Sequence, residues 1–261
     1  MELLRLQQSG PVARILIDHP QRRNAFTRAM WRALPGLVDQ ALATAATRVV
    51  VLQGAQPGLF AAGADISEFA QTYGDPAEAA RASREIQQAA DALDACPLPV
   101  VALIDGPCVG GGVALALACD LRLASEQARF AITPAKLGLS YHPDDLRRLV
   151  RTCGLAAASE LLFAGQLWPA GRALGAGLVN QVLPAAEFAA ASEDLLQAMA
   201  ANSASAVRAI KQGLRAVVAG DARAVAEAEH AFQALFSSPD FIEGRDAFLQ
   251  KRPAFFPSHR P

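Results

Sequence analysis

Two short glycine-bearing segments constrain the fold of this chain more than any other feature. One reads Phe60-Ala61-Ala62-Gly63-Ala64-Asp65, and the other reads Gly106-Pro107-Cys108-Val109-Gly110-Gly111-Gly112. Each follows an apolar run typical of a buried strand, at Val49–Leu52 and at Pro99–Ile104, and the second opens into an apolar helix expected over Val113–Cys119. Small side chains leave backbone N–H groups uncovered, and two such groups that converge on one carbonyl oxygen form an oxyanion hole.

Strand, turn and helix signals alternate through most of the chain. Strands are predicted at Leu3–Leu6 and Val12–Ile17, on either side of a turn at Ser9-Gly10-Pro11. Thr27 can cap a helix that continues to Val38, with a break or kink expected at Pro35-Gly36. Repeated strand–turn–helix units of this kind predict an α/β core.

The pattern changes towards the C-terminus, where helical signals follow one another without strands between them. Earlier helices are predicted over 67–73 and 76–96. From about residue 184 onward, alanine-rich helices are expected over 184–201, 203–219 and 221–236. This part of the chain is therefore predicted to be a helical appendage to the α/β core.

Composition excludes several classes of protein. The chain has 261 residues, of which 52% are hydrophobic, and a net charge of -1 at pH 7. A large core can form, disorder is excluded, and nothing points to a binder of nucleic acid or of acidic membranes. The N-terminus has no long apolar run, and Val113–Cys119 is far shorter than the about 20 residues that span a bilayer. We expect a cytoplasmic protein without a signal peptide.

The four cysteines form no CxxC pair, which favours free thiols in a reducing compartment. They are Cys96, Cys108, Cys119 and Cys153. A nucleophilic role for Cys108 stays open beside the structural one, although no histidine lies near it in the sequence. No cluster of His, Cys, Asp and Glu has metal-ligand spacing, so no metal is expected.

The Gly110–Gly112 turn alone supports more than one interpretation. A phosphate site is one, because uncovered N–H groups and the positive end of a helix dipole meet there. The turn lacks the Lys-Ser/Thr of a P-loop and the GxGxxG spacing of a dinucleotide fold. Close backbone packing is the purely structural alternative.

Taken together, the motifs resemble those of the crotonase superfamily, also called the enoyl-CoA hydratase/isomerase family. The resemblance covers nearly the whole chain, through His19–Phe26, Phe60–Asp65, Gly106–Asp120, Phe130–Gly138 and Glu243–Arg252. It implies a crotonase-type spiral of ββα units over residues 1–197 and a helical C-terminal trimerisation region over 198–261. The assembly it implies is a homotrimer or a dimer of trimers.

The resemblance also implies a mechanism and a set of site residues. Family enzymes bind an acyl-CoA thioester and hold its carbonyl oxygen with two backbone N–H groups, which here match Ala64 and Gly111. An enolate then becomes accessible. Coenzyme A enters as part of the substrate, and no separate cofactor is implied. The residues expected to contact the bound thioester are Ala62, Gly63, Asp65, Ile66 and Thr133, with Asp65 expected chiefly to cap a helix.

The chain departs from the hydratases of this family at both of their catalytic glutamates. The matching positions hold Ala114 and Pro134, which cannot do acid–base work. Family isomerases and a dehalogenase place a carboxylate where this chain has His142. The segment from Thr133 to Tyr141 also resembles methylmalonyl-CoA decarboxylase. A two-glutamate hydration therefore does not carry over, and decarboxylation, isomerisation or a non-catalytic acyl-CoA-binding subunit are the alternatives.

The proton-transfer residues are expected within Tyr141-His142-Pro143-Asp144-Asp145. Tyr141 and His142 are the catalytic candidates, and histidine can act as acid or base near neutral pH. Pro143, Asp144 and Asp145 suit the first turn of a helix. For coenzyme A itself, the resemblance implies contacts from Arg22, Arg23 and Lys251.

Overall fold

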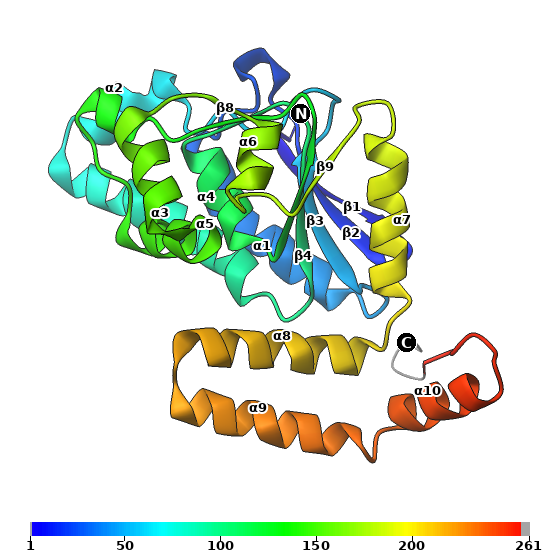
Figure 1. Cartoon of the computed structure of the whole chain (residues 1–261). Helices are drawn as coiled ribbons and strands as arrows, with labels where there is room; N and C mark the ends of the chain where they lie inside the picture. Colours follow the sequence, from blue (N-terminus) through cyan, green and yellow to red (C-terminus); the bar gives the residue numbers. More distant parts are fainter. Residues whose placement is uncertain (1, 257–261) are drawn as a thin grey trace.

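The computed structural model describes residues 2–256, and a six-stranded sheet forms its centre (Figure 1). Neighbouring strands follow the order β1-β2-β3-β4-β6-β9. The β1–β2 pair is antiparallel and every other pair is parallel. The strands are β1 (Leu4–Ser9), β2 (Val12–Ile17), β3 (Val49–Gly54), β4 (Val100–Ile104), β6 (Leu121–Ser125) and β9 (Gln181–Leu183).

Both faces of this sheet are buried, which explains the continuous apolar runs of its central strands. Alternate residues of a strand point to opposite faces. Val50 and Leu52 accordingly belong to the large core on the helical side, while Val49 and Val51 pack with the apolar face of α7 (Phe188–Ala200) on the other side. The sheet is thus the middle layer of the predicted α/β core, which is confirmed.

Helices cover the face of the sheet to which Val50 and Leu52 point (Figure 1). They are α1 (Arg28–Ala43), α2 (Phe69–Tyr73), α3 (Pro76–Ala95), α4 (Gly111–Ala118), α5 (Pro143–Ala164) and α6 (Ala170–Gly175). Three short 3₁₀ segments accompany them, η1 (Pro20–Arg22), η2 (Ile66–Glu68) and η3 (Pro134–Leu137). Helix α1 packs against both α3 and β1, and α4 lies between α3 and α5.

The break expected in the first helix is wrong. Helix α1 runs from Arg28 to Ala43 with Pro35 inside it. A proline there removes one intrahelical hydrogen bond, which costs about 3 kcal/mol in an exposed helix. Leu34 and Val38, which are 0% and 2% exposed, bury the same helix face in the core and hold the helix together.

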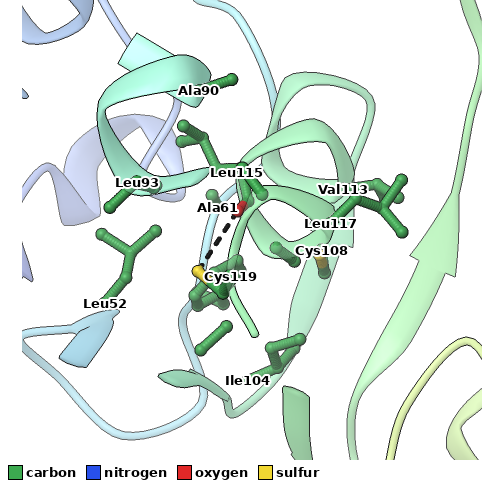
Figure 2. Packing of buried hydrophobic residues seen from close by; sticks show 14 of the residues in the cluster. Leu52, Ala61, Ala90, Leu93, Ile104, Cys108, Val113, Leu115, Leu117 and Cys119 are labelled. Carbon is green, nitrogen blue, oxygen red and sulfur yellow. Dashed lines mark hydrogen bonds between the residues drawn. The ribbon is translucent and has the colours of Figure 1, made fainter. Parts of the chain in front are cut away.

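Helix α4 is buried from Gly112 to Ala118, and the packing around it indicates the role of two cysteines (Figure 2). Cys119, just after the helix, donates its thiol to the Leu115 carbonyl at 3.3 Å. Burial raises the pKa of the Cys119 thiol to about 12, and burial also raises the pKa of the Cys108 thiol well above its usual range. Both are apolar core residues, so the nucleophilic alternative for Cys108 is not supported.

A second, smaller sheet carries one of the glycine segments. Its strands are β5 (Pro107–Val109), β7 (Arg129–Ala131) and β8 (Trp168–Pro169), in the order β5-β7-β8. No strand was predicted for β5, because Pro107-Cys108-Val109 is too short to show a periodicity. Helix α4 begins two residues earlier than expected, at Gly111, directly after this strand and Gly110.

The C-terminal helices form a separate layer below the sheet and its helices in Figure 1. They are α8 (Ala204–Ala219), α9 (Ala222–Leu235) and α10 (Pro239–Leu249), and α8 pairs with α9. The chain leaves the sheet layer after α7, which ends at Ala200. Lys211 of α8 ties this layer to the core through the Asp120 carboxylate and through the Leu98 carbonyl at 2.7 Å. Within residues 2–256, no helix combines the length and apolarity needed to cross a membrane.

Candidate active site

The two glycine segments lie side by side, joined by backbone hydrogen bonds. The Ala61 N–H donates to the Pro107 carbonyl at 3.0 Å, and the Val109 N–H donates to the Ala61 carbonyl at 2.9 Å. Further along, two backbone hydrogen bonds bridge Phe26 to the first segment. The Phe26 N–H donates to the Gly63 carbonyl at 2.7 Å, and the Phe26 carbonyl accepts from the Asp65 N–H at 2.9 Å. The first segment is therefore a short extended strand held between two others.

This pairing brings the Ala64 and Gly111 N–H groups close to each other. A β-carbon built on Gly111 would lie 3.8 Å from the Ala64 nitrogen. Within residues 2–256, neither N–H donates to a backbone carbonyl: the Phe26 bridge uses the groups on either side of Ala64, and Gly111 is the first residue of α4. The site accordingly has two neighbouring donors free to bind one oxygen.

Close approach of the two backbones requires glycine at position 112. A β-carbon on Gly112 would stand 2.5 Å from the Ala61 carbonyl oxygen, well inside van der Waals contact. The Trp31 ring closes the other side, 3.0 Å from a β-carbon built on Gly111 and packed on Phe26 at a centroid distance of 4.5 Å. Trp31 falls within the first predicted helix, and helical spacing alone does not indicate which of its side chains line a pocket.

Ala64 and Gly111 both line one pocket of about 300 Å³. The pocket brings together most of the residues predicted for the site, namely Ala62, Gly63, Ala64, Ile66, Gly111, Thr133, Tyr141 and His142. The two positions that replace the family's glutamates, Ala114 and Pro134, line it as well. Its remaining walls are largely apolar, from Trp31, Phe69, Ile86, Leu137 and Leu139.

His142 lies at the start of α5 and serves as its N-cap. Its Nδ1 accepts from the Asp144 N–H at 3.3 Å and lies 3.6 Å from the Asp144 carboxylate. The imidazole is about one-third exposed. Pro143 is the first residue of the helix and both aspartates lie in its first turn, as predicted.

Tyr141 contacts the glycine turn rather than standing free in the pocket. Its hydroxyl donates to the Gly110 carbonyl at 2.9 Å. Burial, with a smaller contribution from the nearby Asp145 carboxylate, raises the pKa of Tyr141 well above its usual range. The phenol is therefore a neutral donor at physiological pH.

Asp145 lines the pocket, although it was predicted only as part of the first turn of a helix. It is 3% exposed, and its carboxylate accepts from Gln87 Nε2 at 3.0 Å and from Arg148 Nη1 at 3.1 Å. Burial raises the pKa of Asp145, opposed by these two partners. The spacing of Asp145 and Arg148, three residues apart on a helix, was the available signal for an ion pair. Because each carboxylate oxygen accepts a hydrogen bond from a neighbouring side chain, we interpret Asp145 as a structural part of the pocket wall.

Asp65 caps the 3₁₀ segment η2, as predicted. Its carboxylate accepts from the Ser67 N–H at 2.9 Å and from the Ser67 hydroxyl at 2.7 Å. Burial alone would raise the pKa of Asp65, but the Ser67 hydrogen bonds and the charge of Arg22 outweigh it and lower the pKa below its usual range. Asp65 is not among the residues that line the main pocket.

The three predicted coenzyme A contacts lie outside the pocket. Arg22 and Arg23 are exposed beside the first glycine segment, where the Arg23 carbonyl accepts the Ala62 N–H at 3.2 Å. Lys251 is exposed and follows the end of α10. No group of three or more His, Cys, Asp and Glu within the described part of the chain is arranged to hold a metal ion.

Comparisons with known proteins agree with this architecture. The family model described as enoyl-CoA hydratase/isomerase matches residues 7–259. The 2,3-dehydroadipyl-CoA hydratase of Escherichia coli is 33% identical over 97% of both chains, and the short-chain-enoyl-CoA hydratase of Clostridium acetobutylicum is 30% identical over 95% of this chain and 94% of its own.

Solved structures share the fold closely. A protein from Hyphomonas neptunium, assigned to the enoyl-CoA hydratase/isomerase family, superposes with a TM-score of 0.94 at 42% identity, over 98% of this chain and 97% of its own. An enoyl-CoA hydratase from Bacillus anthracis gives 0.92 at 28% identity, over 98% of this chain and 100% of its own. With the paired glycine segments and the α/β fold in place, the chain belongs to the crotonase, or enoyl-CoA hydratase/isomerase, superfamily.

Proposed function

We propose that this protein is an acyl-CoA enzyme that stabilises a thioester enolate and moves a proton with His142. The observation that carries the proposal is the pair of free neighbouring N–H groups, Ala64 and Gly111, opening into a largely apolar pocket. Two donors aimed at a thioester oxygen favour the negative charge that develops there when an enolate forms.

The other walls limit which group can transfer the proton. Among the described residues that line the pocket, the ionisable ones are Tyr73, Tyr141, His142 and Asp145. Tyr141 donates to Gly110, and both Asp145 oxygens are hydrogen-bonded. The imidazole of histidine is the side chain that most often serves as a general acid or base in enzymes. His142 is therefore the group that we assign.

Double-bond isomerisation is the reaction that needs only one such group. His142 first releases the Asp144 N–H from Nδ1, and this nitrogen then removes a proton from C2 of a 3-enoyl-CoA. The electron pair moves into a dienolate whose oxygen accepts from the Ala64 and Gly111 N–H groups. The same proton, now on the imidazole, returns at C4, so the double bond moves to C2–C3 and no atom is gained or lost. Hydration through two carboxylates is not supported, because Ala114 and Pro134 occupy their positions in the pocket.

Decarboxylation of a malonyl-type thioester is a second candidate. Loss of CO₂ leaves the same enolate without any base, and a single donor such as His142 can then protonate it. The observation that favours this reaction is the absence of a free carboxylate among the described residues that line the pocket. The methylmalonyl-CoA decarboxylase resemblance of the Thr133–Tyr141 segment agrees with it.

Assays with crotonyl-CoA, a 3-enoyl-CoA and methylmalonyl-CoA test these alternatives side by side. We expect turnover of the 3-enoyl-CoA or of methylmalonyl-CoA, and loss of that turnover in His142→Gln. Rapid hydration of crotonyl-CoA would overturn the assignment, and so would tight binding of all three thioesters with no turnover, which would indicate a binding subunit.

Coenzyme A binding is proposed to use Arg22, Arg23 and Lys251. The support is the exposure of all three cations and the position of the two arginines beside the segment that carries Ala64. Charge reversal at Arg22 or Lys251 should raise the dissociation constant of coenzyme A measured by calorimetry. An unchanged dissociation constant would remove the residue from the binding site.

Self-association is proposed to bury the apolar surface of the C-terminal helices. Large side chains stand exposed there in the single chain, including Ile210, Leu214, Val217, Phe232, Phe236 and Phe248. Exposed apolar patches of this kind mark interaction sites. Light scattering should give a mass three or six times that of the 27.4 kDa chain. A monomeric mass would contradict the proposed trimer or dimer of trimers.

A further inference from the structure

The carbonyl oxygen of Gly110 accepts three hydrogen bonds at once. Two come from the first turn of α4, from the Val113 N–H at 3.0 Å and the Ala114 N–H at 3.2 Å. The third comes from the Tyr141 hydroxyl at 2.9 Å, a residue 31 positions further along the chain. A distant side chain therefore contacts the turn that carries one of the two oxyanion donors.

This carbonyl and the Gly111 N–H belong to the same peptide group. The group is planar and no cis bond occurs within residues 2–256, so its C=O and N–H point in opposite directions. Whatever fixes the direction of the Gly110 carbonyl also fixes the direction of the Gly111 N–H.

The Gly110–Gly111 peptide is also free of side chains that would hinder a flip. Glycine flanks it on both sides, so no β-carbon hinders rotation about either neighbouring bond. Gly110 already has a φ of 52°, in the region that glycine adopts readily. A flip would aim the N–H away from the pocket and put a carbonyl oxygen in its place, where it would repel a developing oxyanion.

We propose that Tyr141 is a positioning residue, whose hydroxyl holds the Gly110–Gly111 peptide with its N–H aimed at the thioester oxygen. The inference rests on the proposed function, since it presumes that the Gly111 N–H polarises a bound thioester. It replaces the direct catalytic role expected for Tyr141 from the sequence. The phenol is suited to the task because it remains a neutral donor at physiological pH.

The carbonyl stretch of bound butyryl-CoA, labelled with ¹³C at the thioester carbonyl, measures this effect directly. The acyl chain is saturated, so neither hydration nor isomerisation consumes it during the measurement. Difference infrared spectra should show a lower stretching frequency for the thioester bound to the wild type than for the free thioester. Tyr141→Phe, which deletes one oxygen and keeps the ring, should lose part of that lowering.

The chain offers a matched control in its only other tyrosine, Tyr73, which lines the same pocket. Tyr73→Phe makes the same chemical change and should keep the wild-type carbonyl frequency. With the active thioester, Tyr141→Phe should lower kcat by about 10- to 100-fold, the size expected for a misplaced reacting group, with KM nearly unchanged.

The outcomes separate this inference from the proposed function. If the wild type gives no lowering of the carbonyl frequency, the oxyanion hole itself is refuted. If the wild type lowers it and Tyr141→Phe lowers it equally, with kcat unchanged, only the positioning role is refuted. Tyr141→Met, which fills the space with an adaptable apolar chain, serves as the second variant should Tyr141→Phe not fold.

Discussion

The two walls of the pocket are built in different ways. The wall that carries Ala64 and Gly111 is backbone, and backbone hydrogen bonds join its two segments to each other and to Phe26. The facing wall, at the start of α5, is made of side chains that contribute single groups, His142 among them. Under the proposed function, the first wall stabilises the enolate charge and the second wall moves the proton. A change of reaction would then need changes only in the second wall.

The largest expected effect comes from removing a donor from the backbone wall. Ala64→Pro deletes the N–H, and because that group takes no part in the bridge to Phe26, no backbone pairing is lost with it. We expect kcat to fall by about 100- to 1000-fold, as for other oxyanion donors. Ala64→Gly keeps the N–H and is the control for steady-state kinetics. Equal activity in the two variants would contradict the oxyanion role of Ala64.

Next in size is the loss of the ion pair behind the side-chain wall. The Arg148 and Asp145 side chains are 3% and 4% exposed and pair at 3.1 Å. Arg148→Met leaves a buried carboxylate without its partner charge and should lower the free energy of unfolding by about 3 kcal/mol.

A neighbouring arginine provides the control for this variant. Arg147 is 68% exposed, so Arg147→Met should change the free energy of unfolding by less than about 0.5 kcal/mol. Urea unfolding curves of both variants give the comparison. Equal stabilities would show that the wall does not depend on the buried pair.

Replacing His142 tests the side-chain wall itself. His142→Gln should lower kcat by about 100-fold, the lower end of the range for general acid–base groups. His230→Gln, on the exposed surface of α9, is the matched control and should keep full activity. Turnover that survives His142→Gln would move the proton-transfer role to another residue.

The smallest effect is expected at Asp65, which follows Ala64 in the chain and caps η2. Asp65→Ala removes the cap of η2 and should cost about 1 kcal/mol near neutral pH. The pKa of Asp65 is lowered in the folded state, so its contribution is complete above the ordinary carboxyl pKa of about 4 and is lost as the pH falls through the lowered value. The difference between the variant and the wild type in urea unfolding should therefore shrink in acid. A difference independent of pH would contradict the charged cap.

Much of the fold could be predicted from local patterns. Apolar runs at residues 49–52 and 99–104 became central strands, and the alanine-rich C-terminal helices were placed within a few residues. The break predicted at Pro35 was wrong because a local sequence rule takes no account of the neighbouring side chains that are buried in the core. The short strand β5 was missed because a three-residue strand exists only through its pairing with β7.

The sequence by itself determined that this chain has small, uncovered backbone at Ala64 and Gly111 and no carboxylate at positions 114 and 134. Only the tertiary structure decided that the two segments pair, that Asp145 is buried in the pocket wall, and that Tyr141 contacts the carbonyl of Gly110. The physical reason is sequence distance. Spacing along a chain reports neighbours within a strand or a helical turn, whereas a hydroxyl and a carbonyl 31 residues apart meet only after the core has packed.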